Sequence, residues 1–219
     1  MFKKIIIVIV LLLTGGVLTL ASASGIIKIP ILASVLGTDN PKNLIGEVDP
    51  NLYKDVLVKG DITFTGEINK YCLTCDVAYE NFSPLDITLS SAELSSLLQA
   101  TNNDFGPLKE IQIKLKDNDQ IEISGYANLE KYGYNFSGPV YASGSIFKSG
   151  SSKISIEIEK VELGILSIPD KYIKQGEDAL NLLLNQQLSK MTDLKIDSLE
   201  VSNNALHFQG IYPKSASAK

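Results

Sequence analysis

A strand-like run that stops at Gly164 and is followed by a long amphipathic helix limits the folds open to this chain more than any other stretch. Residues 161–188 read VELGILSIPDKYIKQGEDALNLLLNQQL, and Pro169 stands in the first turn of the predicted helix, where its missing N–H costs nothing. One side of this helix is apolar over about 30 Å. Its residues are Tyr172, Gly176, Ala179, Leu180, Leu183, Leu184 and Leu188. We expect this stripe to lie buried against the concave face of a β-sheet.

The remaining chain predicts antiparallel strands, each with one apolar face and one polar face. Residues 108–129, 138–163 and 194–213 show the alternation that is typical of hairpins, and the last hairpin turns at Asn203-Asn204. The apolar positions change parity near Glu159-Lys160, which predicts a β-bulge or a twist there.

Further segments complete the predicted elements. Residues 56–68 alternate between apolar and polar side chains and predict one long strand, which a shorter strand near residues 73–79 follows. Ser90 and Glu93 form a capping box for a helix that runs to about Ala100. We therefore predict an α+β fold in which a curved antiparallel β-sheet wraps around the long amphipathic α-helix, with a second, shorter helix.

The length of 219 residues supports one domain with extensions. Residues 1–23 are predicted to be an N-terminal transmembrane anchor or signal peptide, and residues 24–54 a connector with three prolines. Residues 55–213 form the single predicted α+β globular domain, and residues 214–219 are expected to be a disordered tail.

The N-terminus predicts export. The run from Ile5 to Ala23 contains no charge and would span about 28 Å as a helix, close to the thickness of a hydrocarbon core. Lys3 and Lys4 precede it and should stay cytoplasmic, so residues 24–219 should lie outside the cytoplasm. The small residues at 21–23 also fit a signal-peptide cleavage site. Both interpretations stay open: a single-pass protein of the cell membrane, or a secreted protein if the signal is cleaved.

Charge and cysteine content exclude several classes of function. The net charge is -5 and all 20 basic residues are lysines, so the sequence has no electrostatic footprint for nucleic acid. Cys72 and Cys75 predict a local disulfide that closes a short turn, with two free thiols as the alternative. A metal site would need more soft ligands than these cysteines and the distant His207. We expect no metal and no cofactor.

No pattern of catalytic residues is present in the sequence. His207 is the only histidine and stands between Leu206 and Phe208 on a predicted strand, where a lone imidazole is an ordinary surface residue. The serines at 143–152 include no G-x-S-x-G nucleophile elbow. We therefore predict that the protein is not an enzyme.

Four motifs follow the order and spacing of a family pattern: DITLSSAELSSLL, IQIKLKDNDQIEISGYANL, VELGILSIPDKYI and SLEVSNNALHFQGIYP. Over roughly residues 26–213 the chain resembles a family of uncharacterised, membrane-anchored bacterial envelope proteins, from which it departs in the cysteine-bearing segment around residues 70–83. More distantly, its strand–helix order is similar to the tubular lipid-binding (TULIP-like) domains. That similarity implies a curved sheet wrapped around a long helix and an apolar channel.

Two functions follow as hypotheses. The first is a membrane-tethered, extracytoplasmic domain that binds an apolar ligand such as a lipid; the alternative is a cell-envelope scaffold that recognises a protein partner and has a filled core. The ligand would lie between helix and sheet. Its predicted lining is Ile62, Phe64, Ile111, Ile113, Ile121, Ile123, Ile154, Ile156, Leu180, Leu183 and Leu184.

Overall fold

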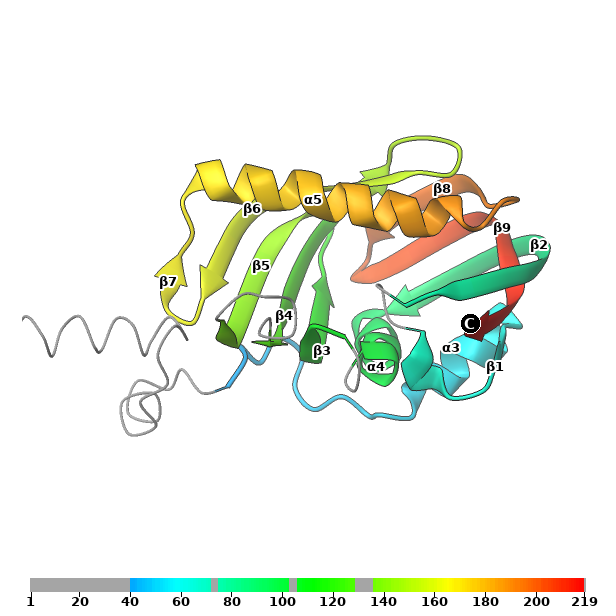
Figure 1. The fold of residues 1–219 in the computed structure, drawn as a ribbon, viewed down its shortest axis with the longest axis horizontal. Coiled ribbons are helices and arrows are strands. Elements are labelled where there is room, and N and C mark those ends of the chain that lie inside the picture. The colour runs from blue at the N-terminus through cyan, green and yellow to red at the C-terminus, as the bar shows by residue number, and fades with distance from the viewer. Residues whose placement is uncertain (1–39, 72–74, 103–105, 129–135, 219) are drawn as a thin grey trace, which may run out of the picture.

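The computed structural model describes residues 40–71, 75–102, 106–128 and 136–218. These residues form three α-helices, one short 3-10 helix and nine strands (Figure 1). The α+β class and the mostly antiparallel strands agree with the sequence-based prediction. The strands are divided between two sheets, however, where the sequence predicted one.

The four-stranded sheet is built around the long strand β9 (Ala205–Ala218). β2 (Val77–Ser90) pairs antiparallel along one side of it. On the other side, β8 (Lys195–Ser202) pairs antiparallel with its first half and β1 (Thr63–Thr65) pairs parallel with its end. The hairpin between β8 and β9 turns at Asn203 and Asn204, as predicted. Residues 214–218 belong to β9, so the prediction of a disordered tail is wrong for them.

The five-stranded sheet is an antiparallel meander in the order β3-β4-β5-β6-β7. Its strands confirm two of the predicted hairpins. They are β3 (Leu108–Leu115), β4 (Gln120–Asn128), β5 (Ser137–Lys148), β6 (Ile154–Leu163) and β7 (Leu166–Ser167).

The pairing of β5 with β6 shows a β-bulge at Glu159, where the sequence predicted a bulge or a twist near Glu159-Lys160. Ser143 pairs with Lys160, but the next residue, Gly144, pairs with Ile158, which leaves Glu159 as the extra residue. A Cβ atom on Gly144 would lie 1.9 Å from the carbonyl oxygen of Glu157. Only glycine therefore fits opposite this bulge.

The long strand predicted at residues 56–68 is wrong. The segment instead forms helix α3 (Leu52–Gly60), the short strand β1 and a 3-10 helix (Ile68–Lys70). Val56 and Gly60 are four residues apart and bury one helical face, and Asp61 ends the helix in a left-handed conformation with φ 49°. α3 also begins inside the predicted connector, and the shorter strand predicted at 73–79 starts only at residue 77 and continues to Ser90.

Helix α4 (Ser91–Asn102) starts at the predicted capping box. The N–H of Ser90 donates to Oε2 of Glu93 over 2.8 Å, and the N–H of Glu93 donates to Oγ of Ser90 over 3.3 Å. From this start α4 runs along the outer edge of β3. Its side chains bond the edge backbone every four residues: Ser91 accepts from Leu115 N–H, Ser95 from Ile113 N–H, and Gln99 donates to the Ile111 carbonyl.

Two apolar clusters fill the space around the four-stranded sheet. One contains Val56, Leu85, Ile87 and Leu89, and the other contains Met191, Leu194 and Ile196. The rings of Phe208 and Tyr212 pack against both clusters and meet edge to face, with centroids 5.8 Å apart. The buried core is thus concentrated at this sheet.

The predicted N-terminal anchor and residues 24–39 lie outside the described residues. Among the helices that the structure describes between residues 40 and 218, none is long and apolar enough to cross a membrane.

Candidate functional site: the inner face of the five-stranded sheet

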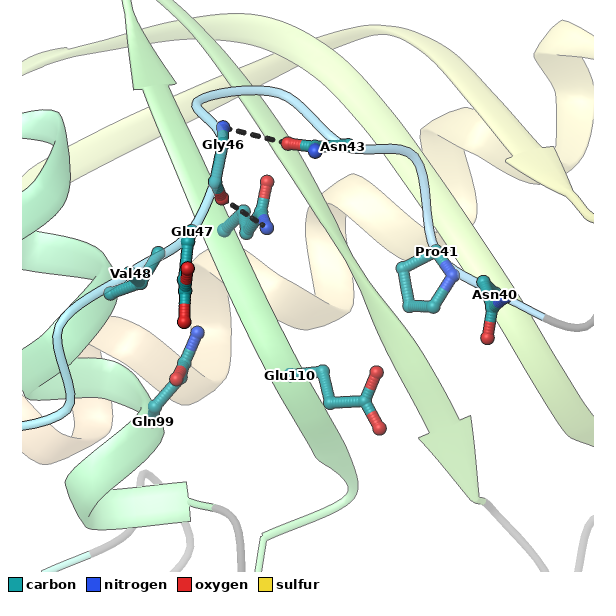
Figure 2. A pocket seen from close by; sticks show the side chains of 9 residues that line it. Asn40, Pro41, Asn43, Gly46, Glu47, Val48, Gln99 and Glu110 are labelled. Carbon is teal, nitrogen blue, oxygen red and sulfur yellow. Dashed lines mark hydrogen bonds between the residues drawn. The ribbon is translucent and has the colours of Figure 1, made fainter.

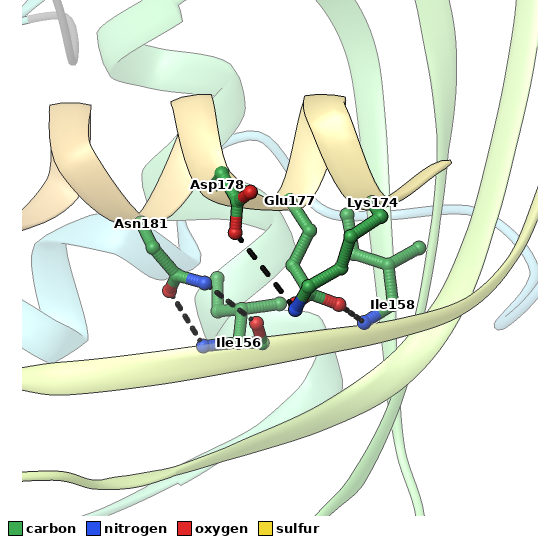
Figure 3. A network of polar contacts seen from close by, with 6 residues as sticks. All are labelled: Ile156, Ile158, Lys174, Glu177, Asp178 and Asn181. Atoms are coloured by element: carbon green, nitrogen blue, oxygen red, sulfur yellow. Dashed lines mark hydrogen bonds and ion pairs between the residues drawn. The ribbon is translucent and has the colours of Figure 1, made fainter. Parts of the chain in front are cut away.

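Helix α5 (Asp170–Ser189) lies along the outer edge of β6 and replaces a neighbouring strand there (Figure 3). The amide of Asn181 accepts from the N–H of Ile156 and donates to its carbonyl, both over 2.8 Å. Asn185 makes the same two bonds with Ile154, over 3.2 and 2.9 Å. Four residues of a helix rise about 6.0 Å, and two residues of a strand rise about 6.6 Å. Side chains four residues apart on α5 therefore lie opposite every second residue of β6.

Glu177 adds a third position to this polar ladder, which we define as Glu177, Asn181 and Asn185. Figure 3 shows Glu177 and Asn181. Its Oε2 accepts from the N–H of Ile158 over 2.8 Å, and its Oε1 pairs with the Lys174 ammonium. Glu177 is only 6% exposed. The Lys174 ammonium, together with the Ile158 N–H, lowers the pKa of this carboxyl below its ordinary value. Glu177 is therefore ionised in this ladder at neutral pH, between the Lys174 ammonium and the Ile158 N–H.

The ladder changes which side of α5 faces the sheet. Tyr172 is 58% exposed, and Gly176 and Ala179 are exposed as well, so the prediction that the whole stripe is buried is wrong at these three positions. Ile173 is buried in their place. The leucines of the stripe remain beside the ladder and are half-buried: Leu180, Leu183, Leu184 and Leu188.

The apolar residues of the five-stranded sheet share one face, which we call the inner face. Ile113 pairs with Ile123, and Ile121 and Ile158 both pair with Gly144. Leu188 of α5 and Ile154 of β6 pack against the cluster of Met191, Leu194 and Ile196, so this end of α5 joins the core of the four-stranded sheet.

The inner face is not filled in the way that the core at the other sheet is. Ile113, Ile121 and Ile123 are only half-buried. Within β5 only two glycines are buried, and β6 has no buried residue among those described. In the four-stranded sheet, by contrast, Leu85, Ile87 and Leu89 are 7–9% exposed. The inner face at β3 and β4 therefore presents apolar surface that no described residue covers completely.

The predicted lining residues divide between three places. Most of them lie on the inner face or on the adjoining side of α5: Ile113, Ile121, Ile123, Ile154, Ile156, Leu180, Leu183 and Leu184. Ile111 is 3% exposed beside α4, where its carbonyl accepts from Gln99, so it does not join them. Ile62 and Phe64 lie far away in the fold, between α3 and β9.

Ile62 and Phe64 line a partly enclosed cavity of about 60 Å³. Its other walls are apolar residues of α3, α4 and β9, together with Tyr79 of β2 and Tyr212 of β9. Desolvation raises the pKa of Tyr79 to about 12, with a further contribution from Tyr212, whose own pKa burial also raises. Sequence reasoning missed both tyrosines; their polar tips in otherwise apolar strands were the available signal.

The opposite face of the five-stranded sheet carries the connector (Figure 2). The amide of Gln112 accepts from Leu44 N–H over 2.7 Å and donates to the Gly46 carbonyl over 3.1 Å. The Lys42 ammonium pairs with Glu162 and lies 3.9 Å from the ring centroid of Tyr141. An open groove of about 330 Å³ lies beside this segment and is lined mostly by polar side chains. The end of the connector is thus held on the domain.

Reactive residues do not gather at either apolar site. Cys75 is disulfide-bonded, whereas Cys72 lies outside the described residues. His207 Nε2 lies 2.8 Å from Oδ1 of the exposed Asp86. Among residues 40–71, 75–102, 106–128 and 136–218, no group of three or more His, Cys, Asp or Glu residues could hold a metal ion.

Comparison with known proteins assigns no family. No protein-family model matches the sequence, and no curated protein matches it. The resemblance to membrane-anchored envelope proteins therefore stays a prediction.

Proposed function

We propose that the chain is a membrane-tethered, extracytoplasmic domain that binds an apolar ligand, such as a lipid chain, between α5 and the inner face of the five-stranded sheet. In this proposal the sheet curves around α5 to form an apolar channel, as in the TULIP-like domains, and no reaction is catalysed. The single observation that carries the proposal is that Ile113 of β3 and Ile121 and Ile123 of β4, on the inner face of the five-stranded sheet, stay partly exposed.

The polar ladder supports this function, because it holds α5 without apolar filling. Asn181 and Asn185 fasten the helix by hydrogen bonds to the edge of β6. The leucines beside them are then free to contact a ligand. Burial contributes about 0.8 kcal/mol per methylene, so about eight methylenes on this face would contribute roughly 6 kcal/mol before the entropic costs of binding.

The chemistry of the surface favours a chain without charge. The predicted lining residues on the inner face and α5 are all isoleucine or leucine. An ionised group placed among them would lose its hydration without gaining a partner.

The tether in this proposal is the uncharged run Ile5–Ala23, and digestion of the domain by protease added outside spheroplasts would test its topology.

The ligand is tested on protein purified from membranes, by native mass spectrometry followed by lipid extraction. Leu184→Trp supplies the matched perturbation, since the larger ring would occupy the ligand's space beside the ladder. Leu182→Trp is the control, because Leu182 is 62% exposed on the other side of the same helix. We expect bound lipid in the parent and in Leu182→Trp, and its loss in Leu184→Trp with little change in stability.

A filled core predicts a different pattern. Leu184→Trp would then overpack and cost about 1–3 kcal/mol, and the parent would yield no lipid. That pair of results would refute lipid binding and would favour the envelope scaffold.

A further inference from the structure

One end of the domain, formed by the β6–β7 turn and the first turn of α5, exposes large apolar side chains. Ile165 is 55% exposed, and Pro169 and Tyr172 are exposed as well. Figure 1 shows both elements at the end of the domain opposite α3. Exposed apolar side chains that gather at one place indicate a contact surface when other features point to the same partner.

The β6–β7 turn is fixed by hydrogen bonds on both sides of Ile165. The Gly164 N–H donates to the Pro139 carbonyl over 2.8 Å, and the Ile168 N–H donates to the Val161 carbonyl over 2.9 Å. Gly164 has a φ of 60°, a conformation that glycine adopts without steric cost. The turn therefore presents the side chain of Ile165 to the outside at a defined place in the fold.

The connector enters the described part of the chain at this same end (Figure 1). The Lys42 ammonium pairs with Glu162, which lies two residues before the turn, and the Lys160 ammonium pairs with the same carboxylate over 2.7 Å. Residues 24–39 separate this point from the predicted anchor, and a segment of that length spans at most about 55 Å. The tether of the proposed function therefore keeps the β6–β7 end of the domain close to the bilayer.

An apolar stripe leads from this end along α5. Tyr172, Gly176, Ala179 and Leu183 lie at positions i, i+4, i+7 and i+11, on one side of the helix. The first three are exposed, and a Cβ atom on Gly176 would meet no described atom within 4 Å. Leu183 is half-buried and belongs to the lining of the proposed ligand site. The exposed apolar end is thus continuous with that site.

Charges of opposite sign balance around this end. Asp170 and Lys171 are neighbours in the first turn of α5, and both are exposed. Lys42 and Lys160 share the carboxylate of Glu162. A surface with apolar side chains and little net charge binds a bilayer through buried apolar area rather than through attraction to acidic lipids.

We propose that the β6–β7 turn and the first turn of α5 form a membrane-contact tip, in which Ile165 and Tyr172 enter the interfacial layer of a phospholipid bilayer. A tyrosine suits this layer, because its ring is apolar and its hydroxyl stays hydrated. The inference rests on the proposed function, since the tether holds the tip at the bilayer. It also names the source of the ligand: an acyl chain of a bilayer lipid, which reaches the inner face along the stripe on α5.

The experiment uses the full chain in nanodiscs of phosphatidylcholine. Ile165→Cys carries an environment-sensitive fluorophore, and lipids brominated in their acyl chains quench this fluorophore only where it enters the bilayer. Val58→Cys with the same label is the matched control, since Val58 is 80% exposed on α3 at the opposite end of the domain (Figure 1). The parent chain gives the background from the native cysteines.

We expect brominated lipid to quench the label at position 165, at low and at high salt alike, and to leave the label at position 58 unchanged. No quenching at position 165, or equal quenching at both positions, would overturn the tip. Quenching that disappears at high salt would overturn apolar insertion. A blue shift without quenching would assign this end to a protein contact, such as a second copy of the chain, and would also overturn the proposal.

The label on Tyr172→Cys decides the matter if Ile165→Cys fails to fold. Lipid extraction from the parent reports on the ligand site separately. Bound lipid without quenching at the tip would refute the tip alone, whereas quenching without bound lipid would refute the ligand site alone. A chain that is released from the nanodiscs would refute the tether, on which both depend.

Discussion

Asn181→Ala tests the polar ladder most directly, because one amide satisfies both backbone groups of Ile156. The substitution leaves an N–H and a carbonyl on the edge of β6 without a partner. Each such group costs about 1–3 kcal/mol when buried, and about 1–2 kcal/mol at this half-buried edge. The higher helix propensity of alanine stabilises the folded state by about 0.6 kcal/mol and offsets part of this loss. We expect a net loss of about 1.5–3 kcal/mol in the free energy of unfolding.

The loss is measured by urea denaturation, with circular dichroism as the probe. Gln186→Ala is the control, because Gln186 is exposed on the same helix and the change to alanine brings only a smaller gain in helix propensity. Hydrogen exchange supplies a local measurement: the Ile156 amide should exchange faster in Asn181→Ala, whereas an amide of the other sheet, such as that of Ile87, should change only with global stability.

Asn181→Ala could prove as stable as Gln186→Ala, with unchanged exchange at Ile156. That result would refute the view that side chains of α5 complete the edge of β6. Asn181→Asp adds a further check, since a carboxylate still accepts from the Ile156 N–H but cannot donate to its carbonyl. Its stability should fall below that of the parent as the pH rises and the aspartate ionises.

Further predictions concern single groups. The pKa of Glu177 is lowered by Lys174, so its contribution to stability is present above the ordinary carboxyl pKa and is lost as the pH falls through the folded value. Urea midpoints measured from pH 6 to pH 3 should therefore fall more steeply in the parent than in Glu177→Gln, and parallel curves would contradict this. The pKa of Tyr79 is raised to about 12. Its contribution to the free energy of unfolding is therefore fully present below pH 10 and is lost between pH 10 and 12. Tyr79→Phe should reduce that fall by about 1–2 kcal/mol, after allowance for the partial exposure of the ring, and an equal fall in both proteins would argue against a buried phenol. Gly210→Ala should destabilise by more than about 3 kcal/mol, because its Cβ atom would lie 1.9 Å from the Lys195 carbonyl oxygen. A thermal midpoint within 3 °C of the parent would exclude this clash.

Local sequence patterns predicted the structure correctly at places where residues close together in the sequence determine it. The capping box at Ser90 and Glu93 and the turn at Asn203-Asn204 depend on residues a few positions apart. The bulge at Glu159 could be predicted because a change of parity within one strand must be absorbed there.

α3 could not be separated from a strand by pattern alone. The spacing of Val56 and Gly60 suits a helix as well as it suits an alternating strand. What decides in favour of the helix is the packing of Val56 against Leu85 and Ile87 of β2, which is a contact between segments distant in sequence. The same limit applies to the end of β9, whose strand partners include residues 63–65.

The orientation of α5 was mispredicted because apolar periodicity was taken to decide which side is buried. Where β7 does not pair with it, the outer edge of β6 has backbone groups that polar side chains can bond. Glu177, Asn181 and Asn185 meet that need and therefore face inwards, although their composition is typical of a solvent-facing side. The tyrosine cavity likewise depends on the register of β2 against β9, which sequence patterns leave open.

The number of positions at which α5 can bond the edge of β6 is limited. Each step gains about 6.0 Å on the helix and about 6.6–6.8 Å on the strand, so the two repeats drift apart by roughly 0.6–0.8 Å per step and by about 2 Å at a fourth position. β6 begins at Ile154, so a fourth position would fall opposite residue 152, outside the strand. Ser189, the fourth position, bonds the Gln186 carbonyl of its own helix instead. Residues 162–163 of β6 are paired by β7. A lengthened α5 would therefore shield no more of the sheet, and a longer β6 would need another strand beside it.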